Sequence, residues 1–378
     1  MTKNTKIFAL TLLVMFFGIT MCGFANGGDF VTNNGKSIIK NDKINNTFGN
    51  FESNYSNNIE VVPSDLTSDE LPHITPYTGE ELWQEPTENH VFATRNQQTG
   101  KVLIEATTGR VLYTSNEDAR LYPASTTKIL TALCVLDNVP LDKVVEIPKE
   151  AVGVEGSSIY LKEGQKISVE DLLFGLMLRS GNDAAVALAI STSGSMEEFA
   201  KLMNKTAIEC GATDSNFVNP HGLQDENHYT TALDLATITA RAYKNQDFVR
   251  IVSSKTRKIK IDDSELVIAN KNKMLKLYDG ANGVKTGFTK SSGRCLVSGA
   301  KRDGMQLISV VLNCGDMWNE SIRMLDFGFD TFEMVNFEKA LLGSGEKTVT
   351  FDAKFLNNGD LFETKFPLRK DGSEKIAL

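Results

Sequence analysis

The sequence predicts an α+β fold in which helices cover an antiparallel sheet, and three observations support this prediction. A β-hairpin pattern stands first, at residues 102–113. Segments with apolar residues at helical spacing follow between residues 125 and 243. Strand patterns return between residues 284 and 312, around a turn at residues 302–304. Strands that gather at both ends of the region, and do not alternate with helices, favour antiparallel pairing.

The predicted helices are defined by their apolar spacing. In the first of them, Ile129, Leu133 and Leu136 recur at intervals of three or four residues. Gly211 stands directly after another and is placed as its C-cap. We expect helices at residues 125–136, 169–178, 183–190, 196–210, 231–243 and 321–327.

The chain of 378 residues is longer than one ordinary domain, and its composition changes along its length. We expect the main folded domain at residues 91–340. Residues 26–90 are rich in Asn, Ser, Asp and Gly, which predicts a flexible stalk, with a small folded domain as the alternative. Residues 341–378 contain two strand patterns, which predict a short β appendage or the start of a larger β domain.

The N-terminus has the pattern of an export signal. Lys3 and Lys6 precede an apolar run at residues 7–25, and residues 23–25 include the small side chains that a signal peptidase reads. The run is almost long enough to span a bilayer, so an uncleaved membrane anchor is the alternative. We therefore expect a signal peptide or anchor at residues 1–25, and a protein that acts in the cell wall or at the outer face of the cytoplasmic membrane.

Composition excludes several classes of function. The formal net charge is -8, and no Lys- or Arg-rich run offsets it, so nucleic acid is not an expected partner. The sequence has four histidines and no Cys-x-x-Cys pair, which argues against a metal site, and no pattern indicates a cofactor. The apolar settings of Cys134, Cys295 and Cys314 predict buried free thiols.

The first chemical motif is Ser125-Thr-Thr-Lys128, at the start of a predicted helix. Pro123 keeps the chain before it extended, so we expect the helix to begin near Ser125. The spacing places Ser125 and Lys128 on one helix face. A serine becomes a nucleophile when a base takes its proton, and a lysine whose pKa is lowered by burial can be that base. Alone, the motif is more typical of a capping serine beside a solvated lysine.

Two further motifs contain polar side chains that can have either a chemical or a purely structural role. Ser180 and Asn182 lie between two apolar helices, where they can relay a proton and bind an amide, or can simply cap a turn. Lys285 and Thr286 open a strand and can hold a carboxylate. Gly287 lets another backbone approach that strand, as a peptide laid alongside it would. The alternative is a surface lysine at the start of a strand.

The three motifs together are more specific than each one alone. Ser-x-x-Lys, a Ser-x-Asn triplet and Lys-Thr-Gly, in this order, are typical of penicillin-binding proteins and class A β-lactamases. Residues 90–335 resemble one group of these, the low-molecular-mass D-alanyl-D-alanine carboxypeptidases. Gly181, in the middle of the triplet, is typical of the carboxypeptidases, whereas β-lactamases usually have Asp there. The segments that carry the resemblance are residues 122–128, 156–160, 180–185, 219–223 and 283–289.

The resemblance implies a β-lactamase/transpeptidase-like fold, with an antiparallel sheet flanked by helices and a helical subdomain. It also implies a reaction on peptidoglycan stem peptides that end in D-Ala-D-Ala. Ser125 would be acylated by the penultimate D-Ala, which releases the last one, and β-lactam antibiotics would acylate the same serine. Lys128 would be the base, and Ser180 would pass a proton to the leaving amine.

The resemblance assigns substrate contacts as well. Asn182 would hold the peptide, while Lys285 and Thr286 would hold its terminal carboxylate. The N–H groups of Ser125 and Phe288 would bind the oxyanion.

Two positions carry weaker expectations. Lys271, in a polar triplet upstream of Lys285, would touch the substrate carboxylate, with a surface lysine as the alternative. His221 is more typical of a structural histidine than of a catalytic one.

Two rival functions stay open. A β-lactamase would need a well-placed carboxylate to activate water, and no convincing Glu motif occurs between residues 140 and 180. A catalytically silent protein that binds the cell wall would take up no labelled penicillin. The sequence does not distinguish hydrolysis from transfer to an amine, because only the acceptor differs.

Overall fold

A computed structural model describes residues 32–33, 36–37, 98–341, 345–350 and 364–376. The predicted signal or anchor and nearly all of the predicted stalk lie outside the described residues. The chain divides into two units, Met1–Asn58 and Ile59–Leu378. In the first unit, β1 (Thr32–Asn33) pairs antiparallel with β2 (Lys36–Ser37). All other described elements belong to the second unit.

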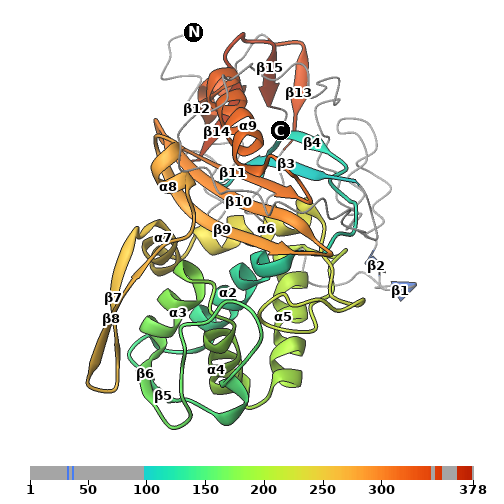
Figure 1. Ribbon diagram of the computed structural model, residues 1–378. Helices are drawn as coiled ribbons and strands as arrows, with labels where there is room; N and C mark the ends of the chain where they lie inside the picture. Colours follow the sequence, from blue (N-terminus) through green and yellow to red (C-terminus); the bar gives the residue numbers. More distant parts are fainter. Residues whose placement is uncertain (1–31, 34–35, 38–97, 342–344, 351–363, 377–378) are drawn as a thin grey trace, which may run out of the picture. The chain divides into compact units, whose positions relative to one another are not determined.

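The second unit is built around a five-stranded antiparallel sheet with the order β4-β3-β11-β10-β9 (Figure 1). The first two strands in sequence are the predicted N-terminal hairpin, and the last three are the predicted C-terminal strands. β9 lies at one edge of the sheet, whereas every residue of the central strand β11 is buried. The five strands are β3 (Gly100–Glu105), β4 (Val111–Ser115), β9 (Ala281–Thr289), β10 (Gly293–Arg302) and β11 (Met305–Leu312).

Most of the helices follow β4 and precede β9 in the chain. Their bounds are η2 (Ala124–Thr127), α2 (Lys128–Asn138), η3 (Lys149–Ala151), α3 (Val169–Leu178), α4 (Asn182–Ser193), α5 (Met196–Cys210), α6 (Ala232–Tyr243), α7 (Gln246–Ser253), α8 (Met274–Leu277) and α9 (Met317–Thr331). α3 and α5 have the predicted bounds, and Gly211 caps α5 with a φ of 88°. The predicted helix at residues 125–136 is instead one 3-10 turn, η2, followed by α2.

Helices cover both faces of the five-stranded sheet. Successive side chains of a strand point to opposite faces. Ile308 and Val310 of β11 belong to the core that contains α6, whereas Leu307 and Val311 belong to the core that contains α9. The sheet therefore separates two apolar layers, as predicted for an antiparallel sheet flanked by helices.

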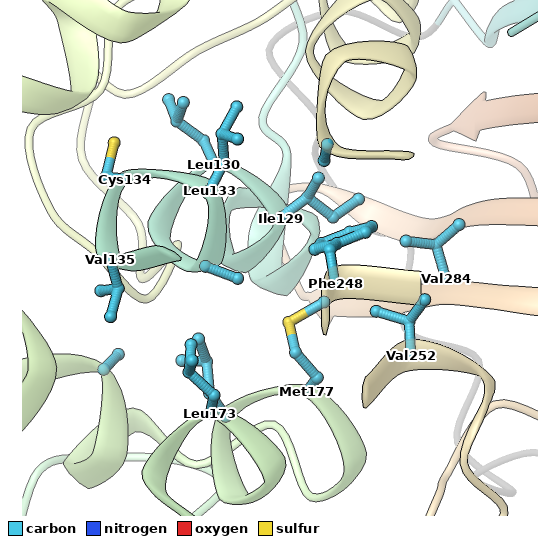
Figure 2. Packing of buried hydrophobic residues seen from close by; sticks show 14 of the residues in the cluster. Ile129, Leu130, Leu133, Cys134, Val135, Leu173, Met177, Phe248, Val252 and Val284 are labelled. Atoms are coloured by element: carbon cyan, nitrogen blue, oxygen red, sulfur yellow. The ribbon is translucent and has the colours of Figure 1, made fainter. Parts of the chain in front are cut away.

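α2 lies at the centre of the larger core. All of its residues from Lys128 to Val135 are buried. Figure 2 shows its apolar side chains among those of α3, α7 and β9, and the labelled partners are Leu173, Met177, Phe248, Val252 and Val284. This packing on several sides fixes α2, and with it the η2 turn that precedes it.

The sequence did not predict a second sheet, of four strands in the order β5-β6-β7-β8. Its strands are β5 (Val144–Glu146), β6 (Lys166–Ser168), β7 (Thr256–Ile261) and β8 (Ser264–Ala269). β7 and β8 form a hairpin that extends from the helical part (Figure 1). β5 and β6 have three residues each, which is too short for a periodic pattern to be recognised.

The C-terminal segment forms a small β structure, which begins with β12 inside the domain expected at residues 91–340. β12 pairs antiparallel with β14, and β13 pairs parallel with β15, around a small separate core. Arg110, directly before β4, reaches into this segment, where its Nη2 lies 2.7 Å from Oε1 of Glu374. The elements are β12 (Phe332–Asn336), α10 (Phe337–Leu341), β13 (Lys347–Val349), β14 (Lys365–Arg369) and β15 (Glu374–Ile376).

Four cysteines lie in the part of the chain that the structure describes, and all four are buried free thiols, as predicted for three of them: Cys134, Cys210, Cys295 and Cys314. Across the described ranges, no helix is both long and apolar enough to cross a membrane. Within the same ranges, no three His, Cys, Asp or Glu side chains are grouped so that they could hold a metal ion.

Candidate active site

The three motifs, which are distant in the sequence, meet at the edge strand β9. Gly287 of β9 lies against the η2 turn, and a Cβ atom at this glycine would be 3.0 Å from the backbone N of Ser125 and 3.1 Å from that of Thr126. Such contacts are tighter than most Cβ atoms make, so η2 would have to move by a few tenths of an ångström to admit a side chain here. Gly287 thus brings the Lys-Thr-Gly strand against the serine.

Ser125 and Lys128 face each other across the η2 turn. A 3-10 helix has three residues per turn, so residues three apart lie directly above one another. Nζ of Lys128 is 3.0 Å from Oγ of Ser125. The cap residue of η2 is Pro123, and no side chain caps this turn. The hydroxyl of Ser125 is therefore placed for contact with an amine, and not for capping.

Three oxygen atoms surround the amine of Lys128, a side chain that is 0% exposed. Besides Oγ of Ser125, they are Oδ1 of Asn182 at 2.7 Å and the backbone oxygen of His221 at 2.6 Å. The two carbonyl oxygens can only accept hydrogen bonds. In a neutral amine they would take both N–H groups, and the lone pair would then face the serine hydroxyl. This is the arrangement that a general base needs.

The surroundings of Lys128 favour this neutral form. Burial holds its pKa well below the usual value, and the nearby ammonium groups of Lys285 and Lys271 lower it further, while Asp183 acts in the opposite direction. Among the described residues, Lys128 forms no ion pair that would compensate for its burial. The lowered pKa thus favours the neutral amine of Lys128 over the ammonium form.

Two residues at the site have a left-handed backbone conformation. Ala124, which precedes the serine, has a φ of 47°, and Ser180 has a φ of 64°. A left-handed conformation costs a non-glycine residue about 1–3 kcal/mol, so the surrounding structure must impose it. Gly222 contributes to this, because its loop passes so close to η2 that a Cβ atom there would be 1.8 Å from the backbone oxygen of Ala124.

The amide of Asn182 is fixed in one orientation. Its Nδ2 donates to the backbone oxygen of Glu155 at 2.5 Å, which turns Oδ1 toward Lys128. Its backbone N donates to the oxygen of Ser157 at 2.7 Å. Gly156 lies between these two acceptors, where a Cβ atom would be 2.8 Å from Nδ2 of Asn182. The loop at residues 155–161 is thus fitted around this side chain.

Asp183 holds the other end of the same loop, a role that the sequence analysis missed. Its Oδ2 accepts hydrogen bonds from Oγ of Ser158 at 2.6 Å and from the backbone N of Ile159 and Leu161 at 3.0 and 3.1 Å. A buried carboxylate needs several donors, and these supply them. The signal available in the sequence was an acidic residue next to Asn182 at the start of an apolar helix.

A cavity of about 920 Å³ opens over these groups. Ser125 and Ser180 line it, as do Thr286, Phe288 and Lys271 of the predicted substrate contacts. Lys128, Asn182 and Lys285 are buried behind its wall. The lining residues are Ser125, Ser157, Ser180, Lys271, Lys273, Thr286, Gly287, Phe288, Arg294, Gly315, Asp316, Met317 and Trp318.

Lys285 is not the surface lysine that the alternative interpretation of its motif predicts. It is 2% exposed, and its Nζ donates to the backbone oxygen of Thr286 at 2.8 Å. Burial, with a smaller effect of the ammonium of Lys271, lowers the pKa of Lys285 to about 7. The side chain therefore carries only part of a charge at neutral pH.

Lys271, the remaining predicted substrate contact, also lines the cavity. Its Nζ donates to Oγ of Ser157 at 3.1 Å, and burial together with Arg179 lowers its pKa. His221 contacts the site through its backbone oxygen, whereas its ring Nδ1 accepts from the backbone N of Leu223. The imidazole thus supports its own loop, and burial lowers its pKa to about 3.

Four further residues that line the cavity were not singled out in the sequence analysis. Arg294 begins β10, and Asp316, Met317 and Trp318 lie where β11 leads into α9. Neither segment contains a recognisable motif, so only their meeting at the cavity identifies them.

A serine hydroxyl in contact with a buried amine of lowered pKa, beside a cavity and an edge strand, defines a serine acyl-transfer site. Residues 88–315 match the family model described as D-alanyl-D-alanine carboxypeptidase. The match covers more than half of the chain, which therefore belongs to this family.

Individual relatives agree with this assignment. The chain is 37% identical over 241 residues to the D-alanyl-D-alanine carboxypeptidase DacF of Bacillus subtilis (61% of this chain, 62% of the relative). It is 35% identical over 249 residues to DacC of Escherichia coli, with 62% of each chain covered. The chain thus spans less than two thirds of the length of these two curated relatives.

Solved structures confirm the predicted transpeptidase-like fold. The DD-transpeptidase of Streptomyces K15 is 35% identical, with a TM-score of 0.58 over 61% of this chain and 96% of that one. A D-alanyl-D-alanine carboxypeptidase of Mycobacterium tuberculosis is 30% identical, with a TM-score of 0.59 over 61% of this chain and 90% of that one.

Proposed function

We propose that the chain is a serine D-alanyl-D-alanine carboxypeptidase that removes the terminal D-Ala from peptidoglycan stem peptides. The observation that carries the proposal is the 3.0 Å contact between Oγ of Ser125 and the buried amine of Lys128. Family membership supports it, and so does an edge strand, β9, along which a peptide can be laid.

The reaction begins with attack on the carbonyl carbon of the penultimate D-Ala. Oγ of Ser125 forms the new bond while Nζ of Lys128 takes its proton. The N–H groups of Ser125 and Phe288 stabilise the oxyanion. The peptide bond then breaks, its nitrogen receives the proton through Ser180, and D-Ala leaves. The acyl group remains as an ester on Ser125.

Water completes the cycle. It attacks the ester carbonyl as Lys128 accepts a proton, and the shortened peptide leaves with its new carboxylate while Ser125 regains its proton. Asn182 holds the peptide amide, while Lys285 and Thr286 hold the terminal carboxylate of the bound substrate. A β-lactam acylates Ser125 in the same way, because its strained amide takes the place of the scissile bond.

The test is to locate the penicillin adduct by mass spectrometry of the intact and digested protein. We expect one adduct, on Ser125. Ser125→Ala removes the adduct and lowers the rate of D-Ala release by at least about 10⁴-fold, because the nucleophile and its partners act as a unit. Ser264→Ala, an exposed serine on β8, is the matched control and keeps both activities.

Other outcomes assign other functions. A penicillin adduct that forms and is rapidly hydrolysed indicates a β-lactamase. No adduct in a folded protein indicates a silent wall-binding protein. Because the K15 neighbour is a DD-transpeptidase, the assay includes an amine acceptor, and products joined to that amine would indicate transfer in place of hydrolysis.

The N-terminal pattern of the sequence supports export, so that the enzyme acts outside the cytoplasm on the cell wall. It also supports membrane association if the apolar run is retained. The mass of the protein recovered from the wall and membrane fractions of expressing cells tests both points. Loss of residues 1–25 indicates a cleaved signal, and retention in the membrane fraction indicates an anchor.

A further inference from the structure

The η2 turn, which carries Ser125, is short and depends on its surroundings for its position. It has four residues and no side-chain cap, and Ala124 at its start has a φ of 47°. Gly287 of β9 packs against it. The segment at residues 216–230 packs against it as well, because a Cβ atom at Gly222 would overlap the backbone of Ala124. The groups that fix this segment therefore help to fix the nucleophile.

The segment at residues 216–230 also bonds to the helix that carries the proposed base. The backbone oxygen of Pro220 accepts from Oγ1 of Thr131 at 2.6 Å. The backbone oxygen of His221 accepts from Nζ of Lys128 at 2.6 Å. The position of the segment thus sets one of the acceptors of the lysine amine.

His228 links this segment to η2 through its two ring nitrogens. Its Nδ1 lies 3.1 Å from the backbone N of Val218, and its Nε2 lies 2.8 Å from Oγ1 of Thr127. A backbone N–H can only donate, so Nδ1 accepts, and the ring proton is assigned to Nε2, which donates to Thr127. Burial lowers the pKa of His228 to about 4, so the ring stays in this neutral form near pH 7.

We propose that His228 is a positioning residue for acylation, which holds η2 through Thr127 and thereby sets the contact between Ser125 and Lys128. The inference rests on the proposed function and adds a residue that the sequence analysis did not single out. His228 and Thr127 are 2% and 0% exposed, so they act on the reaction only through the groups that they hold in place. A displacement of about 1 Å at reacting groups can cost about 10²-fold in rate.

Two substitutions separate the two bonds of His228. Its Nδ1 is two covalent bonds from Cβ, as is Oδ1 of asparagine, so His228→Asn keeps an acceptor for Val218 and removes the donor to Thr127. Its Nε2 is three covalent bonds from Cβ, as is Nε2 of glutamine, so His228→Gln keeps the donor to Thr127 and removes the acceptor for Val218. Each variant therefore loses one of the two contacts.

The measurement is penicillin labelling of the full chain over a range of penicillin concentrations, which separates the binding constant from the rate of acylation. We expect His228→Asn to lower the acylation rate by about 10- to 100-fold, whereas His228→Gln keeps most of it. Both variants should keep the binding constant, because neither changes a group at the cavity surface. The melting temperature should fall in both, since each leaves a buried polar group without its partner.

A second set of variants tests whether the effect passes through Thr127. Thr127→Val removes the hydroxyl and should slow acylation about as much as His228→Asn, while Thr127→Ser keeps the hydroxyl and most of the rate. The double variant Thr127→Val/His228→Asn should be no slower than either single variant, because both remove the same bond.

Ser195→Ala is the control for a hydrogen bond lost elsewhere. Oγ of Ser195 accepts from the backbone N of Glu198 at the start of α5. Its removal should lower the melting temperature without slowing acylation.

Equal acylation rates in His228→Asn and His228→Gln would overturn the inference and leave His228 a purely structural residue. Additive losses in the double variant would overturn it too. So would a wild-type rate in Thr127→Val, an outcome that does not depend on the folding of the His228 variants. In each case the proposed function stands as long as the wild type takes up penicillin on Ser125 and releases D-Ala. A wild type that does neither would overturn both.

Discussion

Lys128 beside the cavity and Arg110 beneath the C-terminal strands are both buried basic side chains, with 0% and 3% of their surface exposed. Their surroundings differ in charge. Arg110 donates to both carboxylate oxygens of Glu374, at 3.0 and 2.7 Å, and to the backbone oxygen of Pro367, and it lies over the ring of Phe332. Lys128 donates only to a hydroxyl and two carbonyl oxygens.

The difference shows that a countercharge determines whether a buried basic side chain keeps its charge. Arg110 keeps its charge in the interior because Glu374 neutralises it, and the pair joins the β3–β4 hairpin to the C-terminal strands. Lys128 has no such partner among the described residues, so its burial disfavours the ammonium form and makes it a proton acceptor. Glu374 offsets the cost of burial at Arg110, whereas in the mechanism that we propose the same cost lets Lys128 activate the nucleophile.

The largest expected effect comes from replacing Lys128, the buried amine without a countercharge among the described residues. Lys128→Met keeps the volume of the side chain but provides no base, and we expect acylation of Ser125 to slow by about 10²- to 10⁴-fold. The measurement is the rate of penicillin labelling by stopped reaction and gel fluorescence. Acylation within tenfold of the wild type would assign the base to another residue, and the comparison would then fail.

Replacing Arg110, which is paired with Glu374, should lower stability without slowing the labelling. Arg110→Met leaves the carboxylate of Glu374 buried without a countercharge, with the backbone N of Arg369 as its remaining donor, and we expect the free energy of unfolding to fall by about 3–5 kcal/mol while the folded protein keeps its labelling rate. Chemical denaturation measures the first quantity. The double variant Arg110→Met/Glu374→Leu should recover most of the loss. A labelling rate that falls with Arg110→Met would mean that the two regions are coupled.

The smallest effect is a pH dependence from Lys285, a second buried amine at the site. The folded protein holds the pKa of Lys285 at about 7, against 10.5 for the usual amine. Between these pH values the unfolded chain binds a proton that the folded chain lacks, so the free energy of unfolding rises with pH, by up to about 1.4 kcal/mol per unit. Below pH 7 the amine of Lys285 is charged in the folded and the unfolded chain, so the folded protein bears the full free-energy cost of burying that charge.

Denaturation at several pH values between 6 and 9 measures this slope. Lys285→Met should reduce the slope. Arg110→Met should keep the slope of the wild type and lower the free energy of unfolding by the same amount at every pH. Equal slopes in the wild type and Lys285→Met would show that the amine of Lys285 is charged in the folded protein. It would then resemble Arg110 more than Lys128.

The sequence by itself determined the elements that depend on near neighbours along the chain. The bounds of α3 and α5 follow from apolar spacing and from the cap Gly211. The pairing of Ser125 with Lys128 follows from their separation by one short turn. The β7–β8 hairpin was missed even though its first strand alternates, because the sequence around Asp262 has no glycine to mark the turn.

Only the tertiary structure decided how the site is completed. The acceptors of Lys128 come from Asn182 and His221, 54 and 93 residues away, and the environment that lowers its pKa is built from segments that the chain brings together only on folding. The burial of Lys285 depends in the same way on strand register. Periodicity records which residues are buried, but charge and reactivity depend on what each buried group finally touches.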